Sequence, residues 1–104
     1  MHSTDMATSG VELRQARAAD LPAIEQFLTM AELTVAGVAE SLPGFIIAES
    51  DDAIVGTAAL EVCEDNALLR SVAVAPAWRS RGLGRALVTR VIADAEARVP
   101  LRPS

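Results

Sequence analysis

The sequence predicts an α/β fold, with a mixed and mostly antiparallel sheet flanked by helices in the order β-α-(α)-β-β-β-α. Three observations predict it. An alternating, strand-like pattern near the start is followed by apolar residues at helical spacing. Three strand-like runs then follow one another with only short turn signals between them, which is typical of an antiparallel meander. The last of these runs leads through a glycine-bearing loop into a long amphipathic helix.

The first strand follows a polar leader. Residues 1–10 lack the apolar core of a secretory signal, and we expect them to form a flexible N-terminal leader. The rest of the chain, residues 11–104, is enough for one small domain. Within it, residues 11–16 alternate apolar and polar side chains and predict a half-buried strand.

The first helix is predicted over residues 21–33. Asp20 stands where an N-cap residue is favoured, and Pro22 is tolerated in the first helical turn. Apolar residues of this segment recur at helical spacing: Leu21, Ile24, Leu28 and Ala31. Residues 35–41 are expected to form a second short helix or an irregular turn.

The meander is predicted over residues 45–49, 53–62 and 67–75. Asp51 and Asp52 form the first connecting turn, and the second is expected at residues 64–66. A glycine within a strand marks a bulge or a close approach of another part of the chain, and Gly56 predicts one of these.

The last helix is predicted over residues 81–98. Its apolar residues form one face suited to packing on the sheet: Leu83, Leu87, Val88, Val91, Ile92 and Ala95. Asp94 and Arg98 are four residues apart, so we expect an ion pair along this helix.

The composition is that of a single acidic globular domain. The chain has 104 residues, 51% of them hydrophobic, and a formal net charge of −5. Nucleic-acid binding depends on a basic surface that neutralises phosphates, so this acidic balance argues against it. All nine basic residues are arginines, and three of them fall between Arg79 and Arg85. A local positive site in an acidic chain predicts one anionic small molecule as its ligand.

The cysteine and histidine content excludes several kinds of site. Cys63 is the single cysteine, so no internal disulfide is expected and a reducing, cytoplasmic location is predicted. With His2 as the single histidine, neither a His/Cys zinc site nor a histidine-based triad is expected, and no metal is predicted. No apolar run approaches the roughly 20 residues of a membrane span.

The segment that follows the third strand of the meander is an anion cradle in physical terms. The strand stops at Pro76, and the loop that follows leads into the last helix. The first amides of a helix have no partner inside it, and the helix dipole places partial positive charge there. Gly82 and Gly84 leave room for a ligand to approach the backbone, and the loop adds three cations, Arg79, Arg81 and Arg85. A ligand with a phosphate group is therefore expected.

Two other phosphate-binding loops are excluded. No Gly-x-x-x-x-Gly-Lys-Ser/Thr run exists, which excludes a Walker A loop. A dinucleotide fingerprint needs glycines directly after the strand and a third glycine or alanine at position 87. Neither condition holds here, because Pro76 follows the strand and Leu87 stands at the third position.

The run Arg79-Ser80-Arg81-Gly82-Leu83-Gly84, preceded by Leu69 to Pro76, resembles the acetyl-CoA motif of the GCN5-related N-acetyltransferases, the GNAT family. The family pattern is Arg/Gln-x-x-Gly-x-Gly/Ala after a strand that ends in an apolar-x-Val-x-Pro run. Strand, proline, loop and helix occur here in the family's order. Residues 42–87 are also similar to the arsenic-resistance and phosphinothricin types of acetyltransferase.

The resemblance implies acetyl-CoA as co-substrate. Backbone groups of the strand would hold the pantetheine arm and the acetyl carbonyl, and main-chain amides of residues 80–85 would hold the pyrophosphate. The expected cofactor-binding residues are Val72, Ala73, Val74, Arg79, Ser80, Arg81, Gly82, Leu83, Gly84 and Arg85. The alternative is that the two glycines form a plain loop and helix cap.

The resemblance also implies a domain truncated after its cofactor helix. A family member continues with another strand, a further helix and usually two more strands, which often supply a tyrosine as general acid. The C-terminal residues 99–104 contain none of these. The exposed strand edge that results is expected to be covered by a second copy of the chain, in a homodimer.

Glu61 and Arg70 are the candidates for acceptor chemistry. Glu61, near the end of the second meander strand, is the candidate general base; the alternative is a solvent-facing strand residue. Arg70 lies within an otherwise apolar strand, where an arginine is costly unless it meets an anion. It either clamps the carboxylate of an amino-acid-like acceptor or pairs with Glu61 or Glu49 across the hairpin.

The first helix implies a further part of the acceptor pocket. By the resemblance, Phe27, Met30 and Glu32 would line it; the alternative is that the first two are core residues and Glu32 is solvated. Together these observations predict an N-acetyltransferase that moves acetyl from acetyl-CoA to the amine of a small acceptor, for instance an amino-acid analogue. The alternative function is a non-catalytic CoA-binding or dimerising remnant of such an enzyme. Neither nucleic acid nor membrane is expected as a partner.

Overall fold

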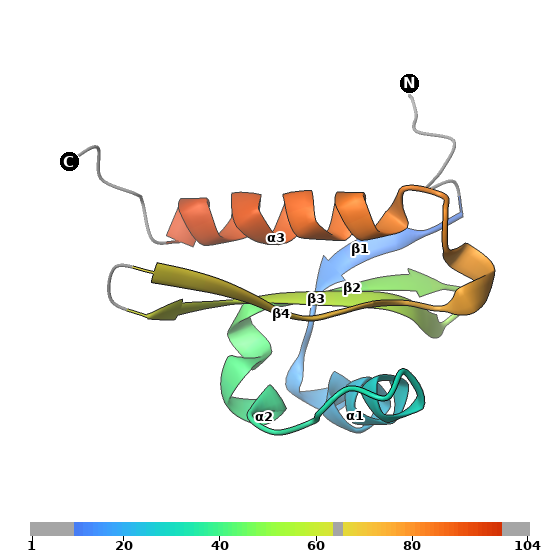
Figure 1. The fold of residues 1–104 in the computed structure, drawn as a ribbon, viewed down its shortest axis with the longest axis horizontal. Coiled ribbons are helices and arrows are strands. Elements are labelled where there is room, and N and C mark those ends of the chain that lie inside the picture. Colours follow the sequence, from blue (N-terminus) through green and yellow to red (C-terminus); the bar gives the residue numbers. More distant parts are fainter. Residues whose placement is uncertain (1–9, 64–65, 99–104) are drawn as a thin grey trace.

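The structure, a computed structural model, describes residues 10–63 and 66–98. Four strands form one sheet in the order β1-β2-β3-β4, with helices on both faces (Figure 1). Helices α1 (Leu21–Met30) and α2 (Val38–Ser41) cover one face, and α3 (Leu83–Arg98) covers the other. The predicted fold class and element order are confirmed.

Every pair of neighbouring strands is antiparallel. The strands are β1 (Glu12–Gln15), β2 (Phe45–Ser50), β3 (Ala53–Cys63) and β4 (Asn66–Val74). Asp51 and Asp52 connect β2 to β3, and both have left-handed backbones with φ of 52° and 66°, as a tight type I′ hairpin turn requires. In the second expected turn, Asn66 already belongs to β4, while Glu64 and Asp65 lie outside the described residues. The leader, apart from Gly10, also lies outside them.

The sheet has a hydrophobic core on each face. Because successive strand residues point to opposite faces, Phe45 and Ile47 pack against the α1 and α2 side, and Ile46 and Ala48 pack against the α3 side. All four are buried, which explains why β2 is apolar without alternation. Thr57 is a buried polar residue, and its hydroxyl donates a hydrogen bond to the carbonyl of Ser71 at 2.7 Å.

Helix α1 begins where predicted but ends at Met30, three residues before the expected end. Glu32 follows with φ of 63°, a left-handed conformation that stops a helix. The amide of Leu33 donates to the carbonyl of Leu28 at 2.9 Å, and that of Glu32 donates to the carbonyl of Thr29 at 3.0 Å. These two bonds form a Schellman motif, which satisfies carbonyls at the helix end.

The N-cap prediction for Asp20 is wrong in its chemistry, although Asp20 does stand directly before α1. Its side chain makes no capping hydrogen bond to that helix. Its carboxylate accepts a hydrogen bond from the amide of Arg17 at 2.7 Å and pairs with Arg14. Asp20 therefore closes the short 3₁₀ turn Ala18–Asp20 instead.

Helix α3 begins at Leu83, two residues later than expected. Its buried face consists of Leu83, Leu87, Val91 and Ala95, as predicted. The prediction is wrong for Ile92, whose side chain is 39% exposed, because it lies about 100° round the helix from Val91. Asp94 pairs with Arg90 at 3.2 Å; its expected partner, Arg98, has a side chain outside the described part of the structure. In the described ranges no helix is long and apolar enough to cross a membrane.

Candidate cofactor and acceptor site

A bulge in β4 precedes the predicted cofactor segment. Thr57 opposes Ala73 and Ala59 opposes Arg70, so a single residue of β3 faces two residues of β4, Ser71 and Val72. Ser71 takes a left-handed conformation, with φ of 56°. A bulge interrupts regular pairing and bends the strand. It separates the first part of β4 from the last part, which leads to the loop.

Gly56 lies opposite Val74, beyond this bulge. Both a bulge and a close approach of another part of the chain, the two features expected of this glycine, are found there. A second irregularity in the β2–β3 register, between Ala48 and Glu49, lies directly beside it. The residue also allows a close approach, because a side-chain carbon added there would lie 2.8 Å from Leu87 Cδ1 and 3.3 Å from the carbonyl of Ala73. Gly56 therefore lets α3 pack tightly against the end of β4 that leads into the loop.

The loop itself is held between the sheet and α3. The amide of Ala75 donates to the carbonyl of Val55 at 2.8 Å, and a 3₁₀ turn, Pro76–Trp78, follows. Trp78 is half-buried against the core cluster that contains Leu83 and Leu87, so it covers the loop and packs against the last helix.

The backbone of this loop presents a row of amides at the start of α3. Gly82 has φ of 80°, which favours glycine, and its carbonyl accepts the amide of Ala86 at 3.0 Å. The next three amides, those of residues 83–85, are first-turn amides without helical partners. In the described part of the chain, no carbonyl or side chain accepts a hydrogen bond from the amides of residues 80–85. These donors are available to an anion.

Three exposed arginines surround these amides: Arg79, Arg81 and Arg85. Arg81 stacks over the Trp78 ring at 5.1 Å from its centroid, which keeps its charge next to the loop. A side-chain carbon added at Gly84 would lie 3.7 Å from Val74 Cγ2, an ordinary contact. The packing of the protein therefore leaves room beside Gly84, where a ligand can approach the backbone.

The last residues of β4 present backbone polar groups beside this anion site. Successive peptide groups of a strand point to opposite edges. Since the amide of Ala75 points to β3, the amide and carbonyl of Val74 point to the open edge, and Arg79 Nε donates to that carbonyl at 3.2 Å. Val72 is 41% exposed. The structure thus brings residues 72–74 and 79–85 together at one end of β4.

Glu61 and Arg70 meet on the opposite side of the bulge. Arg70 opposes Ala59, which packs on the α1 and α2 face, and Glu61 lies on that same face two residues along β3. Arg70 Nη1 donates to Glu61 Oε1 at 3.3 Å, and Nη2 donates to the carbonyl of Ala36 at 2.5 Å. Of the two pairings considered for Arg70, the structure shows the one with Glu61.

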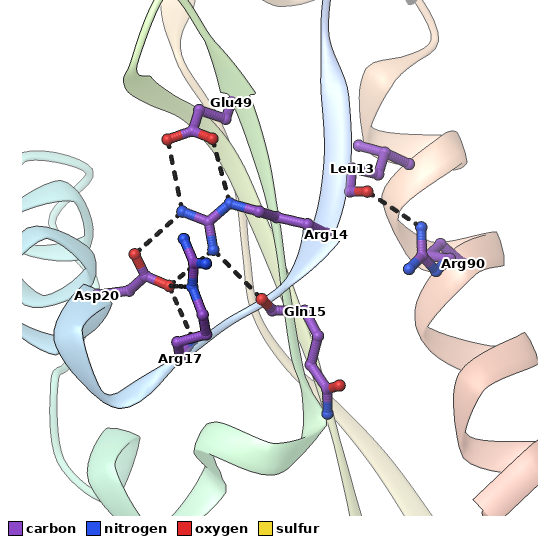
Figure 2. A network of polar contacts seen from close by, with 7 residues as sticks. All are labelled: Leu13, Arg14, Gln15, Arg17, Asp20, Glu49 and Arg90. Atoms are coloured by element: carbon purple, nitrogen blue, oxygen red, sulfur yellow. Dashed lines mark hydrogen bonds and ion pairs between the residues drawn. The ribbon is translucent and has the colours of Figure 1, made fainter.

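Glu49 pairs with Arg14, which is the centre of a network that connects three elements (Figure 2). Arg14 donates two hydrogen bonds to Asp20, at 2.8 and 3.0 Å, and two to Glu49, at 3.1 and 3.4 Å. Its guanidinium lowers the pKa of Asp20 from 3.8 to about 2, and the two carboxylates raise the pKa of Arg14 in turn. The sequence analysis missed Arg14. Arg14 stands at a polar position of an alternating strand, so nothing in the local sequence pointed to its partners.

A cavity of about 290 Å³ lies beside this network and is lined by Phe27 and Met30 among others. Glu32 is not among its lining residues. The cavity reaches Ile54 near the start of β3, whereas Glu61 is seven residues further along, a span of about 23 Å at 3.3 Å per residue. The structure therefore does not bring the α1 candidates together with Glu61 and Arg70. Within the described residues, no group of three or more His, Cys, Asp or Glu side chains could hold a metal ion.

The family model described as "Acetyltransferase (GNAT) family" matches residues 11–101. An amino-acid acetyltransferase from Mycobacterium tuberculosis is 34% identical in an alignment of 90 residues, which covers 77% of this chain and 52% of that protein. The chain thus spans about half the length of this relative.

Many solved structures are similar in fold, among them two that were solved with coenzyme A. The crystal structure of Rv2747 from M. tuberculosis in complex with CoA has a TM-score of 0.69 and 33% identity, over 83% of this chain and 58% of that one. N-acetylglutamate synthase from Neisseria gonorrhoeae, complexed with coenzyme A and N-acetyl-glutamate, has a TM-score of 0.73 and 26% identity, over 84% of this chain and 23% of that one. The expected likeness to arsenic-resistance and phosphinothricin types stays a prediction.

Proposed function

The chain belongs to the GNAT family of acetyltransferases, and on that premise we propose that it binds acetyl-CoA and transfers the acetyl group to the amine of a small acceptor. One observation carries this proposal. At one end of β4, the open backbone groups of the strand edge lie next to the unpaired amides at the start of α3. An extended, amide-containing arm that ends in a pyrophosphate fits such a pair of surfaces.

The residues present fit each part of the ligand. Amides of residues 80–85, with Arg79, Arg81 and Arg85 around them, suit a pyrophosphate, because a helix N-terminus and guanidinium groups both favour negative charge. The exposed edge of Val72 to Val74 suits the pantetheine amides, which can add hydrogen bonds along a strand. The matching solved structures that contain coenzyme A support this assignment.

The reaction needs little covalent chemistry from the protein. The lone pair of a neutral amine attacks the thioester carbonyl, so that the C–N bond forms and negative charge develops on the oxygen. The C–S bond then breaks and CoA leaves as its thiolate, while the nitrogen gives a proton to a base and the thiolate takes one from solvent. Positioning and a hydrogen bond to the developing oxyanion account for most of what a protein supplies in such a step. Glu61 is the proposed acceptor of the proton, directly or through a water molecule; it is 42% exposed and so is within reach of solvent.

An amino acid is the acceptor class that we propose. An amino-acid acetyltransferase is 34% identical to this chain, and a synthase that was solved with N-acetyl-glutamate shares its fold. Arg70 supplies the cation that a carboxylate-bearing acceptor needs. The single cysteine fits the cytoplasmic location expected for the protein, since thiols stay reduced there.

Calorimetric titration of the purified chain with acetyl-CoA tests whether the loop before α3 binds this ligand. We expect micromolar affinity for the unaltered chain and a loss of about tenfold or more in Gly82→Leu, because a side chain there obstructs charge-assisted hydrogen bonds to the loop amides. Gly10→Leu is the matched control. Gly10 has φ of 83°, close to that of Gly82, and nothing lies within 4 Å of an added side-chain carbon. Equal acetyl-CoA affinity in the two variants would contradict the placement of the cofactor.

The alternative function is a CoA-binding or dimerising remnant without turnover. One observation favours keeping it: β4 is an edge strand in the described sheet, so its outer side is open to another chain. The two functions differ in one measurement. Acetyl-CoA binding without release of free thiol, across a panel of amino acids, would support the remnant and exclude the enzyme.

A further inference from the structure

The Arg70–Glu61 pair differs from the pairing of Arg14, although both arginine side chains are half-buried, at 21% and 20% exposed. Arg14 binds Asp20 through two hydrogen bonds of 2.8 and 3.0 Å, the usual length of a strong charge-assisted contact. Arg70 reaches Glu61 through a single contact of 3.3 Å, and the Glu61 side chain is 42% exposed. A long, single, half-exposed ion pair contributes little to stability, so either partner can be replaced at small cost.

The guanidinium of Arg70 stays in place without Glu61. Its Nη2 donates to the carbonyl of Ala36, in the segment between α1 and α2. Gly37 lies directly behind it, and a side-chain carbon there would lie 3.2 Å from Arg70 Nη1. An arginine has five N–H donors, and its bonds to Glu61 and Ala36 use two of them. The guanidinium of Arg70 is therefore held in position and has further N–H donors that can bind a second carboxylate.

Glu61 and Arg70 also lie where an acceptor is needed. Arg70 is the residue directly before the bulge at Ser71 and Val72, after which the open strand edge begins. The two side chains offer one negative and one positive charge 3.3 Å apart on the same face of the sheet. The head of an α-amino acid carries the complementary pair of charges, an ammonium and a carboxylate, on one carbon atom.

We propose that the Arg70–Glu61 pair is the recognition site for the zwitterionic head of an α-amino acid. The carboxylate of the acceptor takes the place of Glu61 on Arg70, and the released Glu61 carboxylate binds the ammonium group. In the free protein, Arg70 and Glu61 thus bind each other in place of the carboxylate and the ammonium group of the acceptor. This inference rests on the proposed function and names the chemical group that the acceptor must carry.

The test compares each amino acid with two analogues that lack one charge. L-glutamate, L-glutamine and L-leucine, their α-amides and their deaminated acids are titrated into the ¹⁵N-labelled chain, and dissociation constants are read from amide chemical shifts. We expect every amino acid that binds to bind about 10- to 100-fold more tightly than its α-amide and its deaminated acid, the usual effect of losing a hydrogen bond to a charged group. Equal affinity for an amino acid and its α-amide, or no binding by any of the three, would overturn the proposal.

Two variants separate the two charges. In Arg70→Gln, we expect the preference for the amino acid over its α-amide to disappear, while in Glu61→Gln the preference over the deaminated acid disappears. Arg90→Gln is the matched control, because Arg90 forms a similar single-pair bridge with Asp94 on α3 and lies on the other face of the sheet. Unchanged preferences in Arg70→Gln, with a native-like amide spectrum, would overturn the proposal.

The same samples titrated with acetyl-CoA separate this inference from the proposed function. Selective amino-acid binding without acetyl-CoA binding would support the recognition site and contradict the acetyltransferase. Acetyl-CoA binding without charge selectivity for the acceptor would support the acetyltransferase and contradict the recognition site.

Discussion

Arg14 connects parts of the chain that are far apart in sequence. Its guanidinium lies between Asp20, six residues away, and Glu49, 35 residues away, so it joins β1 to the start of α1 and to β2 (Figure 2). Its side chain is 20% exposed and that of Asp20 is 14% exposed. A charged pair at this depth must keep its partners, because an unpaired charge there is costly.

This network makes stability depend on pH in the acid range. The pKa of Asp20 is lowered to about 2, chiefly by its hydrogen bonds to Arg14. A carboxyl group with a lowered pKa stabilises the folded state above its ordinary value near 4, and that stabilisation is lost as the pH falls towards 2. We expect Asp20→Asn to lower the free energy of unfolding by about 1–2 kcal/mol at pH 6 and by much less at pH 2.5. Urea unfolding at both pH values measures this difference, and an equal loss of stability at pH 6 and pH 2.5 would contradict the prediction.

At the scale of elements, strands were predicted more closely than helix ends. The strands β2 to β4 are apolar runs separated by turn residues, so adjacent residues in the sequence are enough to predict them. The end of α1, the partners of Arg14 and the bulge at Ser71 depend on contacts with residues elsewhere in the chain. The loop before α3 was predictable because its glycines and arginines are adjacent in sequence. The cavity beside Arg14 was not, since four separate segments line it.

The C-terminal end of α1 offers a direct test of its motif. Glu32 occupies the left-handed position of the Schellman motif, where glycine is the usual residue. We expect Glu32→Gly to raise the free energy of unfolding by about 0.5–1 kcal/mol, because glycine adopts this conformation without steric strain. Glu40→Gly, the same change inside α2, should lower it by a similar amount. Thermal unfolding of both variants measures the difference, and a destabilised Glu32→Gly would contradict the motif.

At the scale of the whole molecule, the outer edge of β4 is the most exposed apolar feature of the described sheet. Leu68 is 60% exposed, Leu69 is 40% exposed and Val72 is 41% exposed. Edge strands with exposed apolar side chains favour pairing with another chain. We therefore expect this chain to associate with itself through Leu68 and Leu69, which lie before the bulge, so that the proposed cofactor edge after the bulge stays open. This is the homodimer that the sequence predicts.

Sedimentation equilibrium measures this association. We expect the unaltered chain to form a dimer at micromolar concentration, and Leu69→Lys to shift it towards monomer, because a charge on an edge strand opposes pairing. Ile92→Lys is the control, since Ile92 is equally exposed, at 39%, but lies on α3. A chain that stays monomeric at high concentration would contradict the prediction.

The order of strands in the sheet is the same as their order along the chain, and every connection joins antiparallel neighbours. The hairpins β2–β3 and β3–β4 close over a few residues, so their loop-closure entropy is small. Strand β1 must instead find β2 across both helices of one face, and Arg14 bonds Glu49 at a separation of 35 residues. We therefore expect the three-stranded meander to form first in folding and β1 to join last. The network around Arg14 would then be the last contact to form, and we expect the native state to open first at the N-terminal strand.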